Sequence, residues 1–204
     1  GHDLEDADVV AQVMDAALRG HMDVAPRGSG VDVAASVYGG TSRYVRSPLS
    51  VTSVEWPKGL RTAVVWTAKA ASTREFLDRL AAFEARDGDR HDALMTRVDQ
   101  GAAAFADAFA HSASEVIAAT HAVFVVLRDL SEASGAPIIE DTLSTIEEHA
   151  RAAGGASKPS GAGGGDVALA FFTSDEDLAR FAKAVPFEIL DVSLGGPGVR
   201  AEAS

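Results

Sequence analysis

The chain has 204 residues, of which 47% are apolar and 24% are charged. This balance is typical of a folded globular domain and excludes an intrinsically disordered chain. Eighteen basic against 30 acidic residues give a net charge of −12, and such a field repels nucleic acid and anionic lipid. Cysteine is absent, which excludes disulfides and thiolate catalysis. No apolar run is long enough to span a membrane and no signal peptide is visible, so we expect a cytoplasmic protein without nucleic-acid or membrane partners.

The N-terminal part mixes helical and strand patterns. Apolar spacing from Leu4 to Leu18 predicts a helix. Residues 31–38 are predicted to be a short buried segment of small residues. Alternating patterns bounded by turn residues predict strands over 42–46, 51–56 and 61–67.

Helical periodicity dominates the rest of the chain. Ser72 and Glu75 have the spacing of a capping box before a helix that carries Phe76. Further apolar stripes predict helices within residues 94–109, 116–130, 138–152 and 175–184, and apolar runs predict strands over 167–172 and 187–192. Because strands and helices are partly segregated rather than strictly alternating, the order of elements favours an α+β architecture.

Two Gly-rich segments contain residues suited to chemistry. In the first, residues 27–40, Asp32 lies between a Gly-Ser-Gly loop and a stretch of small residues that would hold it rigidly; the alternative is that Asp32 simply caps a helix. In the second, residues 158–166, successive glycines allow backbone N–H groups to converge on an anion. A flexible linker is the alternative for this second segment.

A third segment, residues 66–73, follows a predicted strand. Its lysine, Lys69, and the hydroxyls of Ser72 and Thr73 are suited to holding a phosphate at a helix N-terminus. The alternative is an ordinary capped helix beside a solvated lysine. The six histidines lack the spacing of a zinc site, so we expect no metal site built by this chain alone.

In this order and spacing, the three segments resemble the GHMP small-molecule kinases, most closely those that act on phosphomevalonate. The motifs that carry the resemblance are Gly-Ser-Gly-Val-Asp-Val-Ala-Ala-Ser from residue 28, Trp-Thr-Ala-Lys-Ala-Ala-Ser-Thr from residue 66, and Lys-Pro-Ser-Gly-Ala-Gly-Gly-Gly-Asp from residue 158. The third motif favours phosphomevalonate over mevalonate or homoserine as the substrate.

The resemblance implies a fold and a domain organisation. The fold is the ferredoxin-like C-terminal lobe of these kinases, an antiparallel sheet with helices packed on one face and an antiparallel helical layer over residues 88–152. Residues 1–40 are expected to be a helix and Gly-rich segment from the junction between lobes. Residues 41–195 are expected to be the C-terminal domain, and residues 196–204 a flexible tail.

The resemblance also implies roles for individual residues. Asp32 is expected to be the catalytic aspartate, which accepts or orients the proton of the attacking oxygen. The residues expected to contact substrate or phosphate are Ser29, Gly30, Lys69, Ser72, Thr73, Ser160, Gly161, Gly163, Gly164 and Gly165.

The family's kinases use ATP and Mg²⁺, and their nucleotide phosphate loop, Pro-x-x-x-Gly-Leu-Gly-Ser-Ser-Ala, is absent from these residues. We therefore expect this chain to be the substrate-side portion of a kinase, inactive alone, with a complementary N-terminal nucleotide-binding polypeptide as partner. The missing partner should leave apolar surface exposed around residues 31–38 and the first helix. The alternatives are a kinase for mevalonate or another small alcohol, and a non-catalytic binding module.

Overall fold

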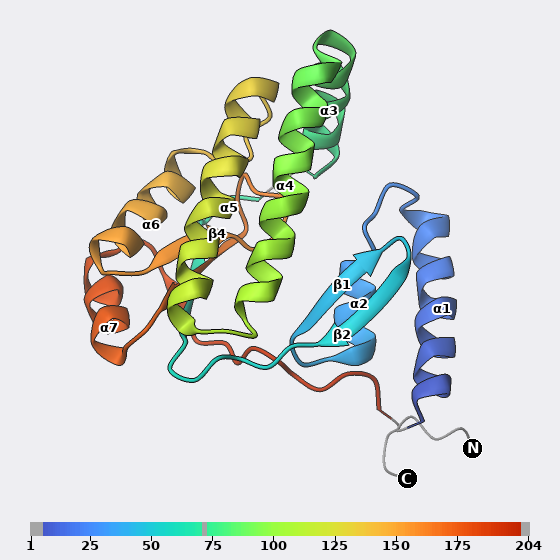
Figure 1. Ribbon diagram of the computed structural model, residues 1–204, viewed down its shortest axis with the longest axis horizontal. Helices are drawn as coiled ribbons and strands as arrows, with labels where there is room; N and C mark the ends of the chain where they lie inside the picture. The colour runs from blue at the N-terminus through green and yellow to red at the C-terminus, as the bar shows by residue number, and fades with distance from the viewer. Residues whose placement is uncertain (1–5, 71–72, 201–204) are drawn as a thin grey trace. The chain divides into compact units, whose positions relative to one another are not determined.

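The protein, described here from a computed structural model of residues 6–70 and 73–200, divides into two compact units (Figure 1). The first comprises residues 1–55 and 193–204, and the second residues 56–192. This division differs from the predicted boundaries after residues 40 and 195. The difference arises because the first two strands pack with the N-terminal helices, through Tyr44 and Val51, and not with the later sheet.

The first unit contains two helices and a two-stranded antiparallel sheet. Helix α1 spans Ala7–Val24, α2 Val31–Tyr38, and strands β1 and β2 span Ser42–Arg46 and Leu49–Ser53. Met14 of α1 packs against Ala34 and Val37 of α2, and all three are buried. The predicted small-residue segment is thus a helix, buried on one face only, because its inward positions are three residues apart.

The C-terminal residues join this unit. Val199 donates its N–H to the carbonyl of Val37, and Pro197 pairs with Gly39. A side chain at Gly198 would meet the Val37 carbonyl at 2.3 Å, so only glycine allows this close approach. Residues 197–199 of the predicted flexible tail are therefore fixed by backbone pairing, while residues 201–204 lie outside the described residues.

The second unit is built on a four-stranded antiparallel sheet in the order β4-β5-β3-β6. Its strands are β3 (Arg61–Trp66), β4 (Ala156–Pro159), β5 (Val167–Phe172) and β6 (Ile189–Leu190). Residues 158 and 159 of the Gly-rich segment belong to β4 and pair with β5, so the interpretation of residues 158–166 as a flexible linker is wrong. The last strand is shorter than predicted, and β2 begins and ends earlier than the predicted strand 51–56.

Helices cover both faces of this sheet, so the prediction that they pack on one face is wrong. On one face, Ala63, Ala170 and Phe172 pack against α6 (Asp141–Ala152) and α7 (Asp175–Ala184). On the other, the Phe171 ring lies 5.9 Å from Phe105 of α4 (Gly88–Ala108). The alternation of side chains along each strand explains why neighbouring residues reach opposite helices.

The long helices form the predicted antiparallel layer. Helix α4 packs along α5 (Ala113–Ser134), and α3 (Thr73–Arg86) completes a cluster with them (Figure 1). The buried residues of this cluster are Phe76, Phe83, Leu94, Leu130, Ala136 and Ile138. The α+β fold class is thereby confirmed. In the described part of the chain, no helix is both long and apolar enough to cross a bilayer.

A buried carboxylate ties α6 to the edge strand. Glu147 is 4% exposed and accepts hydrogen bonds from the Ser157 backbone N–H of β4 and from His121 of α5, the latter at 2.7 Å. A buried carboxylate is stable only when its oxygens are paired, and here each oxygen has a partner on a different element.

Glu147→Ala should lower the free energy of unfolding by about 2–3 kcal/mol, because the buried Ser157 N–H loses its acceptor. The adjacent, exposed Glu148 is the matched control, and Glu148→Ala should change stability by less than about 0.5 kcal/mol. Urea unfolding of both variants measures the difference. An equal decrease in the free energy of unfolding in both variants would show that the Glu147 carboxylate does not stabilise the contact between α6 and β4.

Candidate functional site

Asp32 lies in the first turn of α2, where a carboxylate is favoured by the positive end of the helix dipole. The N-cap residue of α2 is Gly30, in the left-handed conformation with φ 79°, and no side chain caps the helix. The interpretation of Asp32 as a helix cap is therefore wrong. Its side chain is 69% exposed, which leaves the carboxylate open to a ligand.

The loop before Asp32 is fixed by side chains of β1. Tyr44 donates its hydroxyl to the Ser29 carbonyl at 2.8 Å, and Arg46 donates to the Gly28 carbonyl at 2.9 Å. Ser29 also accepts a bond from the Val31 N–H at 3.3 Å. The predicted residues Ser29 and Gly30 thus share a restrained loop with Asp32 in the first unit.

In the second unit, Thr67 joins the two other predicted segments. The Thr67 backbone N–H and hydroxyl both donate to the Asp166 carbonyl at 3.0 Å. Asp166 in turn donates its N–H to the Lys69 carbonyl at 2.7 Å. Ala68 and Asp166 have φ of 58° and 56°, which costs energy for residues other than glycine and is typical of functional loops. The structure therefore brings the Lys69 segment and the Gly-rich loop together.

The last three glycines of the loop are packed against protein. A Cβ at Gly163 would lie 2.3 Å from the Ile138 carbonyl, and one at Gly164 2.2 Å from the Phe76 ring. Gly164 donates its N–H to Ile138 at 2.8 Å, and a Cβ at Gly165 would meet the Lys69 carbonyl at 2.7 Å. These positions need glycine for close packing, and their role as ligand contacts stays a prediction.

The beginning of the loop is open. Ser160, Gly161 and Ala162 are exposed. Ser160 donates its N–H to Val167 at 3.0 Å, which closes the base of the loop. No acceptor within residues 6–70 and 73–200 takes the N–H of Gly161 or Ala162. The Ser160 hydroxyl and these two amides are therefore the donors that an anion can reach, and Ala162 is a residue that sequence reasoning missed.

Lys69 is held at the same place by an ion pair. Its ammonium lies 3.0 Å from Glu140, the N-cap residue of α6, and half of its side chain is exposed. Glu140 makes no capping bond to α6, so its carboxylate is free to orient Lys69. Ser72 lies outside the described residues, and of Thr73 only its place at the start of α3 is described.

Lys158, also missed as a functional residue, lies in β4, two residues before Ser160. Its ammonium donates to the Pro159 carbonyl at 2.8 Å and lies 5.4 Å from the centre of the Phe105 ring. Burial lowers the pKa of Lys158 to about 8, because desolvation disfavours the charged amine. Its place in the third motif was the only signal in the sequence.

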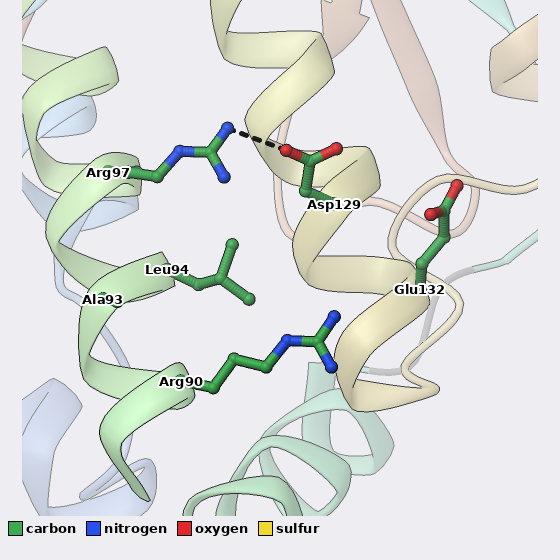
Figure 2. Close-up of a pocket in the computed structure, with 6 residues that line it drawn as sticks. All are labelled: Arg90, Ala93, Leu94, Arg97, Asp129 and Glu132. Atoms are coloured by element: carbon green, nitrogen blue, oxygen red, sulfur yellow. Dashed lines mark hydrogen bonds and ion pairs between the residues drawn. The ribbon is translucent and has the colours of Figure 1, made fainter. Parts of the chain in front are cut away.

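A separate hollow of about 350 Å³ lies between α4 and α5 (Figure 2). Arg97 pairs with Asp129 across it at 2.7 Å. Two guanidinium groups face two carboxylates there, so the local charge is balanced. It contains none of the predicted residues, so we place the candidate anion-binding residues at the two loops of the second unit. Asp32, in the first unit, is described by itself.

Comparisons with known proteins show what the chain is similar to. Residues 117–189 match the family model described as GHMP kinases C terminal. In sequence, the chain is 29% identical over 174 residues to phosphomevalonate kinase of Streptomyces sp. strain CL190, a match that covers 74% of this chain and 46% of the relative. The chain thus spans about half the length of this curated relative.

Solved structures show the same fold. The Lin0012 protein of Listeria innocua superposes with a TM-score of 0.77 at 23% identity, over 91% of this chain and 61% of its own. Phosphomevalonate kinase of Streptococcus pneumoniae, in complex with phosphomevalonate and AMPPNP, gives 0.64 at 18% identity, over 80% of this chain and 54% of its own. Mevalonate kinase of L. major, in complex with R-mevalonate, superposes with a TM-score of 0.66 at 19% identity. This match covers 79% of this chain and 52% of the mevalonate kinase chain. The resemblance to the GHMP kinases is therefore confirmed in sequence and in fold.

Gly164→Ala should lower the free energy of unfolding by about 3 kcal/mol, because it combines a left-handed φ of 72° with a clash against Phe76. Gly161 is the matched control, since a Cβ there meets nothing within 4 Å. Gly161→Ala should stay within about 0.5 kcal/mol of the unmodified protein. Thermal or urea unfolding measures both, and equal effects would refute the packing role of Gly164.

Lys158→Met should stabilise the protein at pH 7 by about 1–3 kcal/mol, because folding no longer buries a charged amine. Between pH 8 and the ordinary lysine value of 10.5, the folded protein releases the Lys158 proton while the unfolded chain keeps it. The stability of the unmodified protein therefore rises over this range, and the advantage of the variant shrinks. Urea unfolding at pH 7 and pH 10 tests this, with the exposed Lys183→Met as control; an advantage that does not change with pH would contradict it.

Proposed function

We propose that this chain is the substrate-side portion of an ATP-dependent kinase that phosphorylates phosphomevalonate. The observation that carries the proposal is the open start of the Gly-rich loop, with Ser160, Gly161 and Ala162, clamped through Thr67 to the segment of Lys69. Hydrogen-bond donors and an ammonium gathered in this way suit a phosphate group. They also explain how a chain with a net charge of −12 binds an anion.

In the proposed reaction, an oxygen of the substrate's phosphate attacks the γ-phosphorus of ATP, and the bond from that phosphorus to the β-bridging oxygen breaks. The products are ADP and a diphosphate ester. Asp32 accepts or orients the proton of the attacking oxygen, and the loop donors neutralise charge on the phosphate. Holding the reactants in line supplies most of the rate enhancement.

The resemblance implies ATP and Mg²⁺ as cofactors. The exposed donors of the loop fit a phosphate of a nucleotide or of the substrate. Within the described ranges, no three carboxylate or imidazole groups cluster so that they hold a metal ion, so we assign no Mg²⁺ ligands to this chain.

A complementary nucleotide-binding polypeptide is part of the proposal. Support comes from the relatives, which are about twice the length of the matched region, and from the surface of α2, where Val31 and Tyr38 are 51% and 39% exposed. Such apolar side chains on a short helix are suited to contact with another polypeptide.

The competing substrate is mevalonate, since an enzyme for mevalonate has a similar fold. The kinase assay compares phosphomevalonate and mevalonate side by side in the protein translated from the complete coding sequence of the gene. A preference for mevalonate would show that mevalonate, and not phosphomevalonate, is the substrate. The absence of any phosphoryl transfer would favour a non-catalytic binding module.

In the protein translated from the complete coding sequence of the gene, Asp32→Asn should lower kcat by about 10²–10⁴-fold. It should leave the free energy of unfolding nearly unchanged, since the side chain is exposed. The matched control is Asp23→Asn, an exposed aspartate of the same unit, which should retain full activity. ADP release measured with saturating ATP and saturating phosphomevalonate gives kcat. Near-normal kcat in Asp32→Asn would remove Asp32 from the mechanism.

A further inference from the structure

We propose that His21, on the last turn of α1, is the positioning residue of Asp32, an inference that rests on the proposed function. The His21 Nδ1 atom lies 3.8 Å from the Asp32 Oδ2 atom. This is the distance of an ion pair and is longer than a hydrogen bond. The Nδ1 edge of the ring therefore orients the carboxylate across this gap without a direct hydrogen bond.

The two side chains differ in exposure. The His21 side chain is 20% exposed and that of Asp32 69%, so the ring is the fixed member and the carboxylate the accessible one. Within the described residues, His21 is the one charged or titratable partner of the Asp32 carboxylate. Oδ1 is thus left without a protein partner and is available for the proton of the substrate.

Gly28 shapes the slot that holds the ring. A Cβ at Gly28 would lie 2.3 Å from the His21 Nε2 atom and 3.0 Å from the Ala25 carbonyl. Any side chain at this position would displace the ring. The absence of a side chain at Gly28 therefore has a specific physical reason, which is contact with His21.

The slot also selects the tautomer of the imidazole. The Nε2 atom is buried and has no hydrogen-bond partner in the described part of the chain. A proton there would be an unpaired buried donor, which is costly, whereas a proton on Nδ1 faces the carboxylate. We therefore assign the proton of neutral His21 to Nδ1.

Neighbouring groups hold the same loop rigid. Arg46 spans from the Gly28 carbonyl to the Met22 sulfur, at 2.9 and 3.7 Å, and Tyr44 holds the Ser29 carbonyl. Other charged side chains on the elements around His21 are Asp15, Arg19, Asp23, Arg27, Arg43 and Arg46. Asp15 and Arg19 pair with each other, and the carboxylate that lies 3.8 Å from the ring is that of Asp32.

The assignment is tested first by nitrogen NMR of the imidazole at a fixed pH, on the 204-residue protein and without any activity assay. The Nδ1 resonance should be that of a protonated nitrogen. Asp32→Ala should shift it toward the Nε2–H tautomer, and Gly28→Ala should do the same by displacing the ring. Gly20→Ala is the control, since a Cβ at Gly20 meets nothing within 4 Å, and it should leave the resonance unchanged. An unchanged signal in Asp32→Ala would overturn the inference.

Kinetics of the active kinase give the second test. His21→Asn places an amide nitrogen near the Nδ1 position, and His21→Gln places it near Nε2. His21→Gln should lower kcat about tenfold with little change in KM, while His21→Asn should restore most of the loss. Equal kcat in both variants and the unmodified enzyme would overturn the positioning role. Retained activity in Asp32→Asn would instead refute the proposed function, whatever the NMR result.

Discussion

The pairing of β3 with β5 is the constraint on which the candidate site depends. The two strands are antiparallel over six residue pairs, from Arg61–Phe172 to Trp66–Val167. Where the ladder ends, Thr67 continues it by donating to Asp166, a residue 99 positions away in sequence. Because both loops leave the sheet at this end of the β3–β5 pair, the Lys69 segment and the Gly-rich loop meet. Any change of strand register would separate them.

Charge explains how the site is arranged. The chain carries a net charge of −12, so anion binding needs donors that are local and oriented. Backbone N–H groups and one hydroxyl at the start of the loop supply them without adding carboxylate repulsion. Lys69 is oriented by Glu140, and Lys158 has a pKa lowered to about 8 by burial. Partly buried polar groups of this kind are typical of sites that bind a phosphate.

The sequence predicted the elements well where apolar periodicity was strong. The three long helices within 88–152, β3 and α7 lie where the pattern placed them. The sequence pattern did not predict the helix over residues 31–38, since small residues suit either a helix or a buried strand. It also did not predict β4, because this strand of four residues is flanked by glycines that are typical of a loop. Tertiary pairing with β5 decides that strand, and no local pattern of its own predicts it.

The sequence by itself predicted the candidate residues, because the motifs of Asp32, Lys69 and the Gly-rich loop resemble those of a known family in order and spacing. Only the tertiary structure decided which of these positions are packed against protein and which are open. Gly163, Gly164 and Gly165 approach other backbone or an aromatic ring too closely for any side chain, while Gly161 and its neighbours remain open. The partners Glu140 and His21 come from distant or separate elements. Spacing along the chain cannot encode such contacts, because they exist only when strands and helices have packed.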